Sequence, residues 1–248
     1  MLRCKPVYKE PEQNEEAILF AFPVTKNLST CMEVECLKIQ TTLIFSHFPF
    51  SLSEIHEHNF SPSGKLPCLL VDGKVYAGRD IIIQAAQRGL DIDSFLSPTQ
   101  KSSMNAFKSQ VESKIGFCLD LELWYDSHFN SITLLQRGIS YPWPLNLIIP
   151  RLERNQKIKE MMASRPIYGQ AQICLDGLSL LLGDQQPTTL DAVVFAYIHI
   201  ILSLLSKSST DSKLRKFVLQ HDNLVQYSRR LWQNWYARVD SVASSLQS

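Results

Sequence analysis

The longest apolar run of the chain lies in its C-terminal third. From Ala192 to Leu205 nearly every position is apolar, and Thr188 precedes this run with Asp191 three residues further on. That spacing is typical of a capping box, in which two side chains accept free N–H groups of the first helical turn. The run is shorter than the roughly 20 apolar residues of a membrane span and contains His199. It therefore predicts a helix beginning at Thr188 and buried at the centre of a helical domain.

The N-terminal third alternates strand patterns with helical patterns. The apolar run 17–22 predicts a buried strand. Apolar residues spaced by three and four over 31–45 predict a helix, with Ser29 or Thr30 as its cap. A second strand over 48–52 is expected to follow.

A hairpin signal comes next, because Asp72-Gly73 separates two runs that favour strands. Pro67 begins the first of these runs, where the peptide bond before it is a candidate for the cis form. The pattern over 80–87 predicts a short helix that ends at Gly89. The resulting order, β-α-β-β-β-α, is that of a thioredoxin-like domain.

From residue 99 onward the patterns are helical. Four amphipathic helices are expected in addition to the central one, over 104–124, 145–162 with a kink at Pro150, 167–182 and 224–235. Prolines interrupt the pattern at Tyr141–Pro144. The sequence therefore predicts an α+β protein of glutathione-transferase-like architecture, with an N-terminal segment over 1–16, a thioredoxin-like domain over 17–92 and an all-helical domain over 99–240.

Composition narrows the function classes. The chain has 248 residues, is 45% hydrophobic and carries a formal net charge of +1, so it is neither a disordered protein nor one whose overall field would attract a nucleic acid or an anionic membrane. The N-terminal residues become acidic without an apolar or Arg-rich leader pattern, and we expect no cleavable presequence. Six cysteines lack C-x-x-C pairs and are expected to be buried free thiols in a reducing compartment, at positions 4, 31, 36, 68, 118 and 174.

Four segments resemble the metaxin family, most nearly its metaxin-2 type. The run over 141–146, Tyr-Pro-Trp-Pro-Leu-Asn, is the specific one. The segments over 61–67 and 186–195 are shared with glutathione transferases and indicate the fold, and the match over 223–230 is weaker. The segments occur in the family's order over most of the chain.

The resemblance implies a function without catalysis or a cofactor. It predicts a peripheral, cytosol-facing subunit of the sorting and assembly machinery of the mitochondrial outer membrane, which inserts β-barrel proteins. Its expected partners are a second metaxin-like subunit, an integral outer-membrane β-barrel and β-barrel precursors. A scaffold of the same fold in a soluble complex, such as a translation factor, would show no membrane association.

The candidate partner-binding residues lie in and after the proline-rich turn. Trp143 could fill a groove between helices, or it could anchor a partner as an exposed rigid aromatic residue. A basic helix face, Arg151, Arg154, Lys157 and Lys159, could be solvated or could meet anionic lipid headgroups. The residues that we predict to bind a partner are Tyr141, Pro142, Trp143, Pro144, Arg151 and Arg154.

The enzymatic alternative is a glutathione transferase or a related thiol-dependent enzyme. After the hairpin, transferases place an acidic residue and a serine that hold the γ-glutamyl carboxylate, whereas this chain has Gly78-Arg79. Ser29, Thr30 or Cys31 could activate a thiol at the start of the first helix. The favoured interpretation is that Ser29 and Thr30 cap this helix and that Cys31 packs.

Metal binding has weak support in the sequence. His56, Glu57 and His58 have no third ligand at a recognisable spacing, which favours a solvated polar loop. His199, inside the central helix, is expected to be a core histidine with one hydrogen bond.

Overall fold

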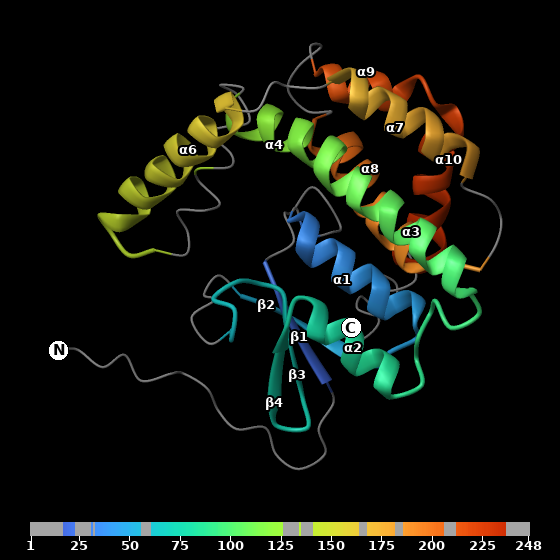
Figure 1. The fold of residues 1–248 in the computed structure, drawn as a ribbon. Coiled ribbons are helices and arrows are strands. Elements are labelled where there is room, and N and C mark those ends of the chain that lie inside the picture. The colour runs from blue at the N-terminus through green and yellow to red at the C-terminus, as the bar shows by residue number, and fades with distance from the viewer. Residues whose placement is uncertain are drawn as a thin grey trace, which may run out of the picture. The chain divides into compact units, whose positions relative to one another are not determined.

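The chain folds into two compact units, Met1–Ile92 and Asp93–Ser248. The computed structural model describes residues 17–22, 31, 33–55, 61–125, 134, 141–163, 168–181, 186–205 and 212–236. The first unit carries a β-sheet with two helices, and the second consists of helices (Figure 1).

The described part of the first unit has the β-α-β-β-β-α order predicted from the sequence. The second strand begins two residues later than expected, at Phe50. The elements are β1 (Ala17–Ala21), α1 (Val34–Phe45), β2 (Phe50–Glu54), β3 (Cys68–Val71), β4 (Lys74–Ala77) and α2 (Arg79–Gln87).

Strand β1 lies inside a mixed sheet that, within the described residues, has the order β2-β1-β3-β4. Leu19 of β1 is paired in parallel with Leu52 and antiparallel with Leu69. Strands β3 and β4 form the predicted hairpin, and its turn residues Asp72 and Gly73 both have positive φ, 50° and 70°. This conformation is the one that Asp-Gly favours in a two-residue hairpin.

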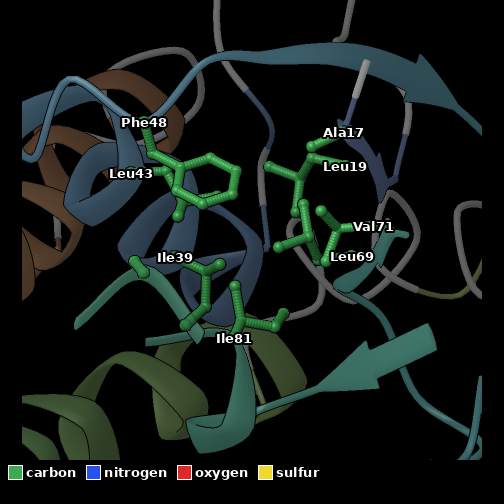
Figure 2. Packing of buried hydrophobic residues seen from close by; sticks show 9 residues of the cluster. Ala17, Leu19, Ile39, Leu43, Phe48, Leu69, Val71 and Ile81 are labelled. Carbon is green, nitrogen blue, oxygen red and sulfur yellow. The ribbon is translucent and has the colours of Figure 1, made fainter. Parts of the chain in front are cut away.

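One face of the sheet packs against α1 and α2. Leu19 and Leu69 from the sheet are fully buried, as are Leu43 of α1 and Ile81 of α2. Figure 2 shows these side chains converging with Ile39, Phe48 and Val71. Burial of this apolar surface is what joins the two helices to the sheet. The peptide bond between Leu66 and Pro67, just before β3, is cis.

The predicted cap of α1 is wrong. The helix begins at Val34 with Glu33 as its N-cap, and no side chain makes a capping hydrogen bond. Cys31 forms an isolated β-bridge, and its Sγ accepts a hydrogen bond from the Glu33 amide at 3.4 Å. Because Cys31 is held in extended backbone, the helix cannot start before it. Ser29 and Thr30 lie outside the described residues.

The second unit contains the predicted helices and elements that the sequence patterns did not indicate. The segment predicted as one helix over 104–124 begins earlier and includes a π-helical turn. The described elements are α3 (Pro98–Gln110), η1 (Val111–Ile115), α4 (Gly116–Tyr125), α6 (Leu145–Ala163), α7 (Tyr168–Leu181), α8 (Thr189–Leu204), α9 (Lys213–Leu219), α10 (Asp222–Leu231) and η2 (Trp232–Tyr236).

Helix α9 was not predicted from the sequence. It has only seven residues, too few for a helical period to stand out. Its signal is local, because Ser212 accepts a hydrogen bond from the Arg215 amide and Leu214 and Val218, one turn apart, are buried.

Helix α8 is the buried central helix that the sequence predicts. Thr188 is its N-cap, and the capping box with Asp191 is formed on both sides. Asp93 adds a second acceptor, since its carboxylate accepts hydrogen bonds from the Thr189 amide at 2.9 Å and from the Thr189 hydroxyl at 2.5 Å. The Tyr227 hydroxyl of α10 donates to Asp191. The N-terminus of α8 is therefore bonded to α10 and to the segment before α3.

Replacement of Asp191 by alanine should destabilise the protein by about 2 to 4 kcal/mol. The change removes a helix cap and leaves the buried Tyr227 hydroxyl without its acceptor. Urea unfolding measures the effect. The matched control is Asp222→Ala, which removes an exposed carboxylate from the first turn of α10 and should cost less than about 1 kcal/mol. Equal losses in the two variants would contradict this role of Asp191.

Gly116, the first residue of α4, leaves room for the Tyr197 side chain of α8. A Cβ atom at this position would lie 2.8 Å from the Tyr197 Oη and 3.2 Å from the ring, whereas at Gly177 in α7 it would meet nothing within 4 Å. We expect Gly116→Ala to destabilise the protein by about 1 to 2 kcal/mol, because overpacking outweighs the gain in helix propensity. Gly177→Ala should stabilise it by up to about 1 kcal/mol. Thermal unfolding of both variants checks the opposite signs.

Candidate functional site

The proline-rich turn leads directly into α6. The Asn146 amide donates to the Pro142 carbonyl, and the Leu147 amide donates to the Pro144 carbonyl, both at 3.1 Å. The peptide bond between Trp143 and Pro144 is cis. The Trp143 side chain is 80% exposed. It therefore does not fill a groove between helices, and its predicted role as an anchor for a partner stays a prediction.

Two of the six predicted partner-binding residues hold this region in place. The Tyr141 hydroxyl donates to the Glu153 carboxylate at 3.4 Å, which joins the turn to α6. The Arg154 Nε donates to the Trp124 carbonyl at 3.1 Å, which joins α6 to the end of α4. Both side chains are half-buried. Pro142, Trp143, Pro144 and Arg151 are exposed, so the structure places four of the six on the surface.

An apolar surface on α6 was missed by the sequence reasoning. Leu145, Ile148 and Leu152, here called the α6 stripe, are 44%, 48% and 61% exposed. Their spacing of three and four residues puts them on one helix face. The signal was present in the sequence, but apolar residues at this spacing normally indicate a buried face, so the pattern alone predicted packing.

The exposed charges on the described part of α6 are cationic. Arg151 and Lys159 are exposed, whereas Glu153 is half-buried and accepts the Tyr141 hydroxyl. The Arg151 guanidinium donates to the Leu147 carbonyl one turn earlier. The predicted basic face is thus divided, with Arg154 turned toward α4; the Lys157 side chain lies outside the described residues.

The described thiols of the first unit are poorly suited to catalysis. Cys31 is 2% exposed, and Cys36 and Cys68 are fully buried in the same apolar cluster. Burial raises the pKa of Cys36 well above its ordinary value, and burial raises the pKa of Cys68 to about 11. These two thiols are therefore protonated near neutral pH, and the thiolate is the reactive form.

The prediction of buried free thiols is confirmed within the described residues, whereas the predicted reducing compartment stays a prediction. The five cysteines there, Cys31, Cys36, Cys68, Cys118 and Cys174, are free and buried. Burial also raises the pKa of Cys118 and of Cys174 to about 11. Cys4 lies outside the described residues.

The position of the transferase serine has no hydroxyl here. Gly78 is the N-cap of α2, with φ of 55° and no capping side chain, and Arg79 is the first residue of the helix. Both residues are exposed. A ligand at this helix end would meet backbone N–H groups and the Arg79 side chain, without the serine that the transferases use.

Glu122 is a buried carboxylate that the sequence did not single out. It accepts hydrogen bonds from the Ser212 hydroxyl at 2.5 Å, the Leu214 amide at 2.9 Å and the Tyr168 hydroxyl at 3.4 Å. It therefore caps α9 from α4. Burial and the neighbouring Glu122 raise the pKa of Tyr168. This arrangement has a structural role, because each of these hydrogen bonds joins Glu122 to another helix or its cap.

Metal binding gains no support from the described residues. No group of three His, Cys, Asp or Glu residues there could hold a metal ion. His56, Glu57 and His58 lie outside this part of the chain. His199 is half-buried and its ring stacks on Phe195, with centroids 5.2 Å apart and an interplanar angle of 30°.

His199 should make stability depend on pH. Burial lowers its pKa from 6.5 to about 4, so the unfolded chain takes up a proton in a range where the folded protein does not. The contribution to stability is complete above pH 6.5 and is lost as the pH falls toward 4. Between about pH 7.5 and about pH 5 the protein should lose about 2 kcal/mol more than the His199→Gln variant. Urea unfolding at both pH values tests this; equal losses would show that His199 is protonated in the folded state.

Two family models match the chain. Residues 36–154 match the model described as outer mitochondrial membrane transport complex protein. Residues 171–231 match the C-terminal domain of glutathione S-transferase. Along the described residues, no helix combines the length and the apolar character needed to cross a membrane.

Curated relatives are similar over most of their length. A metaxin-2 homologue of Caenorhabditis elegans is 26% identical over 210 residues, which covers 78% of this chain and 86% of that protein. Human metaxin-2 is 29% identical over 219 residues, which cover 81% of this chain and 81% of that protein. Bovine metaxin-1 is 28% identical over 219 residues, covering 79% of this chain and 68% of that protein.

Glutathione transferases are among the solved structures that match. One from Phanerochaete chrysosporium superposes with a TM-score of 0.52 at 12% sequence identity, and the match covers 88% of this chain and 96% of the transferase. At this identity the likeness concerns the fold. The predicted α+β, glutathione-transferase-like architecture is confirmed.

Proposed function

We propose that this chain, a member of the metaxin family with a glutathione-transferase-like fold, is a non-enzymatic subunit of the machinery that inserts β-barrel proteins into the outer mitochondrial membrane. A role in a transport complex of that membrane follows from the family model over residues 36–154. The finer elements of the proposal are the β-barrel substrates, a peripheral position and a cytosol-facing surface.

The observation that carries the proposal is the exposure of Trp143. It lies in the run Tyr-Pro-Trp-Pro-Leu-Asn, the specific part of the resemblance, and 80% of its surface is uncovered. Two prolines restrict the backbone around it. A large aromatic residue on a restricted turn is suited to anchor a partner, because it buries much area at little cost in conformational entropy.

The absence of catalysis is part of the proposal. Cys31, the thiol that precedes α1, is 2% exposed, and the transferase serine is replaced by Arg79 beside Gly78. Transferase-like folds carry many functions, so the chemistry has to be judged from the residues at the site. These residues support binding more than thiol chemistry.

We propose that the turn and the first half of α6 attach the chain to its complex. Trp143 with Pro142 and Pro144 would contact a protein partner, either a second metaxin-like subunit or the integral β-barrel. Tyr141 and Arg154 would act as positioning residues, through Glu153 and the Trp124 carbonyl, respectively. Arg151 lies on the exposed side of the same helix turn.

The proposal is tested by the native size and composition of the tagged chain. The chain is expressed in its own cells and extracted from mitochondria in mild detergent. It should co-migrate with an integral outer-membrane β-barrel and a second metaxin-like protein. Trp143→Ala should weaken this association by about thirtyfold or more, as expected for an aromatic anchor. Phe95→Ala, which truncates another exposed aromatic residue, is the control and should retain the complex.

Other outcomes identify the alternatives. A soluble dimer retained on immobilised glutathione would overturn the proposal and make Cys31 the residue to mutate next. A soluble complex without membrane components would indicate a scaffold of the translation-factor kind. Retention of the complex by Trp143→Ala would show that another surface anchors the chain.

A further inference from the structure

The exposed side of α6 is apolar over its first two turns. Leu145, Ile148 and Leu152 form the α6 stripe. Isolated exposed apolar residues are common on proteins, but a contiguous group marks a contact with a partner or a membrane. The α6 stripe is not needed to pack α6 on the rest of the unit, because the opposite side of the helix makes that contact.

The packed side of α6 is defined by other residues. Pro150 is buried, Asn146 is half-buried, and Arg154 donates to the Trp124 carbonyl of α4. These three residues recur at every fourth position, so they share one face, turned away from the α6 stripe. In Figure 1, α6 packs at the end of α4 and extends away from α7, α9 and α10. The α6 stripe is therefore on a projecting helix.

The exposed charges among the described side chains of α6 are of one sign. Arg151 and Lys159 are the exposed charged residues among the described side chains of α6, and the Glu153 carboxylate is half-buried against Tyr141. A surface that combines apolar side chains with flanking cations is complementary to an anionic lipid layer. Apolar side chains enter the boundary between headgroups and acyl chains, while arginine and lysine reach the phosphates.

We propose that the α6 stripe inserts into the headgroup layer of an anionic membrane, with Arg151 and Lys159 bound to lipid phosphates. This inference rests on the proposed function and specifies it, because Trp143 would contact protein while the neighbouring helix face contacts the lipid around that protein. A lipid layer is favoured over a protein groove because it is fluid and accepts a projecting convex surface without a matching shape.

The purified full-length chain tests the inference without its partners. Its binding is measured by flotation with vesicles of phosphatidylcholine and phosphatidylinositol in a ratio of about two to one, and with vesicles of phosphatidylcholine alone. The chain should bind the anionic vesicles more tightly, and added salt should weaken this binding.

Three variants separate the contributions. Leu152→Asp should weaken binding by at least about tenfold, because it places a charge in the stripe. Arg151→Gln combined with Lys159→Gln should weaken it by about twenty-five-fold, or about fivefold for each lost cation. Ile173→Asp on α7 is the matched control, because Ile173 is 71% exposed but does not belong to the proposed membrane-binding surface. This variant should bind vesicles like the unmodified chain. Circular dichroism verifies that each variant is folded.

Several results would overturn the inference. These are no binding of the unmodified chain to anionic vesicles, equal losses in Leu152→Asp and Ile173→Asp, or equal binding to both kinds of vesicle. If Leu152→Asp leaves vesicle binding intact but removes the chain from its mitochondrial complex, a partner protein covers the stripe. In that case the lipid inference fails while the proposed function stands. Vesicle binding by a chain that joins no mitochondrial complex would contradict the proposed function alone.

Discussion

The helical unit depends on the hydrogen bonds that hold the N-terminus of α8. This helix is apolar on nearly every face, so it is stable only when other helices surround it, and its first N–H groups must find acceptors away from water. Thr188, Asp191 and Asp93 supply these acceptors, and Tyr227 bonds Asp191 in turn. The cap thus joins α10 and the segment before α3 to the central helix, and Gly116 leaves room for the Tyr197 side chain of that helix.

A helix that does not belong to this core carries the candidate surface. Helix α6 packs on α4 through one face, where Arg154 meets the Trp124 carbonyl, and Tyr141 ties the preceding turn to Glu153. These contacts use the polar and central residues of α6 and leave Ile148 and Leu152 uncovered. The stability of the unit therefore does not account for the apolar stripe, which is why we propose an external contact for it.

The likeness to the solved glutathione transferase concerns the fold. The fold brings Cys31, Cys36 and Cys68 into one buried cluster, where burial raises the pKa of Cys36 and Cys68. At the start of α2, where the transferases hold their substrate, Arg79 is exposed and a hydroxyl is missing. A fold that binds a thiol substrate elsewhere serves here, in our proposal, to present a turn and a helix face to a membrane complex.

The sequence by itself determined the element order of the first unit, the hairpin at Asp72-Gly73 and the capped, buried helix from Thr188, because turn, cap and periodicity signals are local. Only the tertiary structure decided what distant residues do. Glu122 caps α9 across 90 or more positions, and Cys31 displaces the predicted start of α1 through a bridge. The pattern of Leu145, Ile148 and Leu152 was readable as an apolar face. Whether another helix covers that face depends on how α6 packs on α4. The spacing of apolar residues along one helix does not determine this packing.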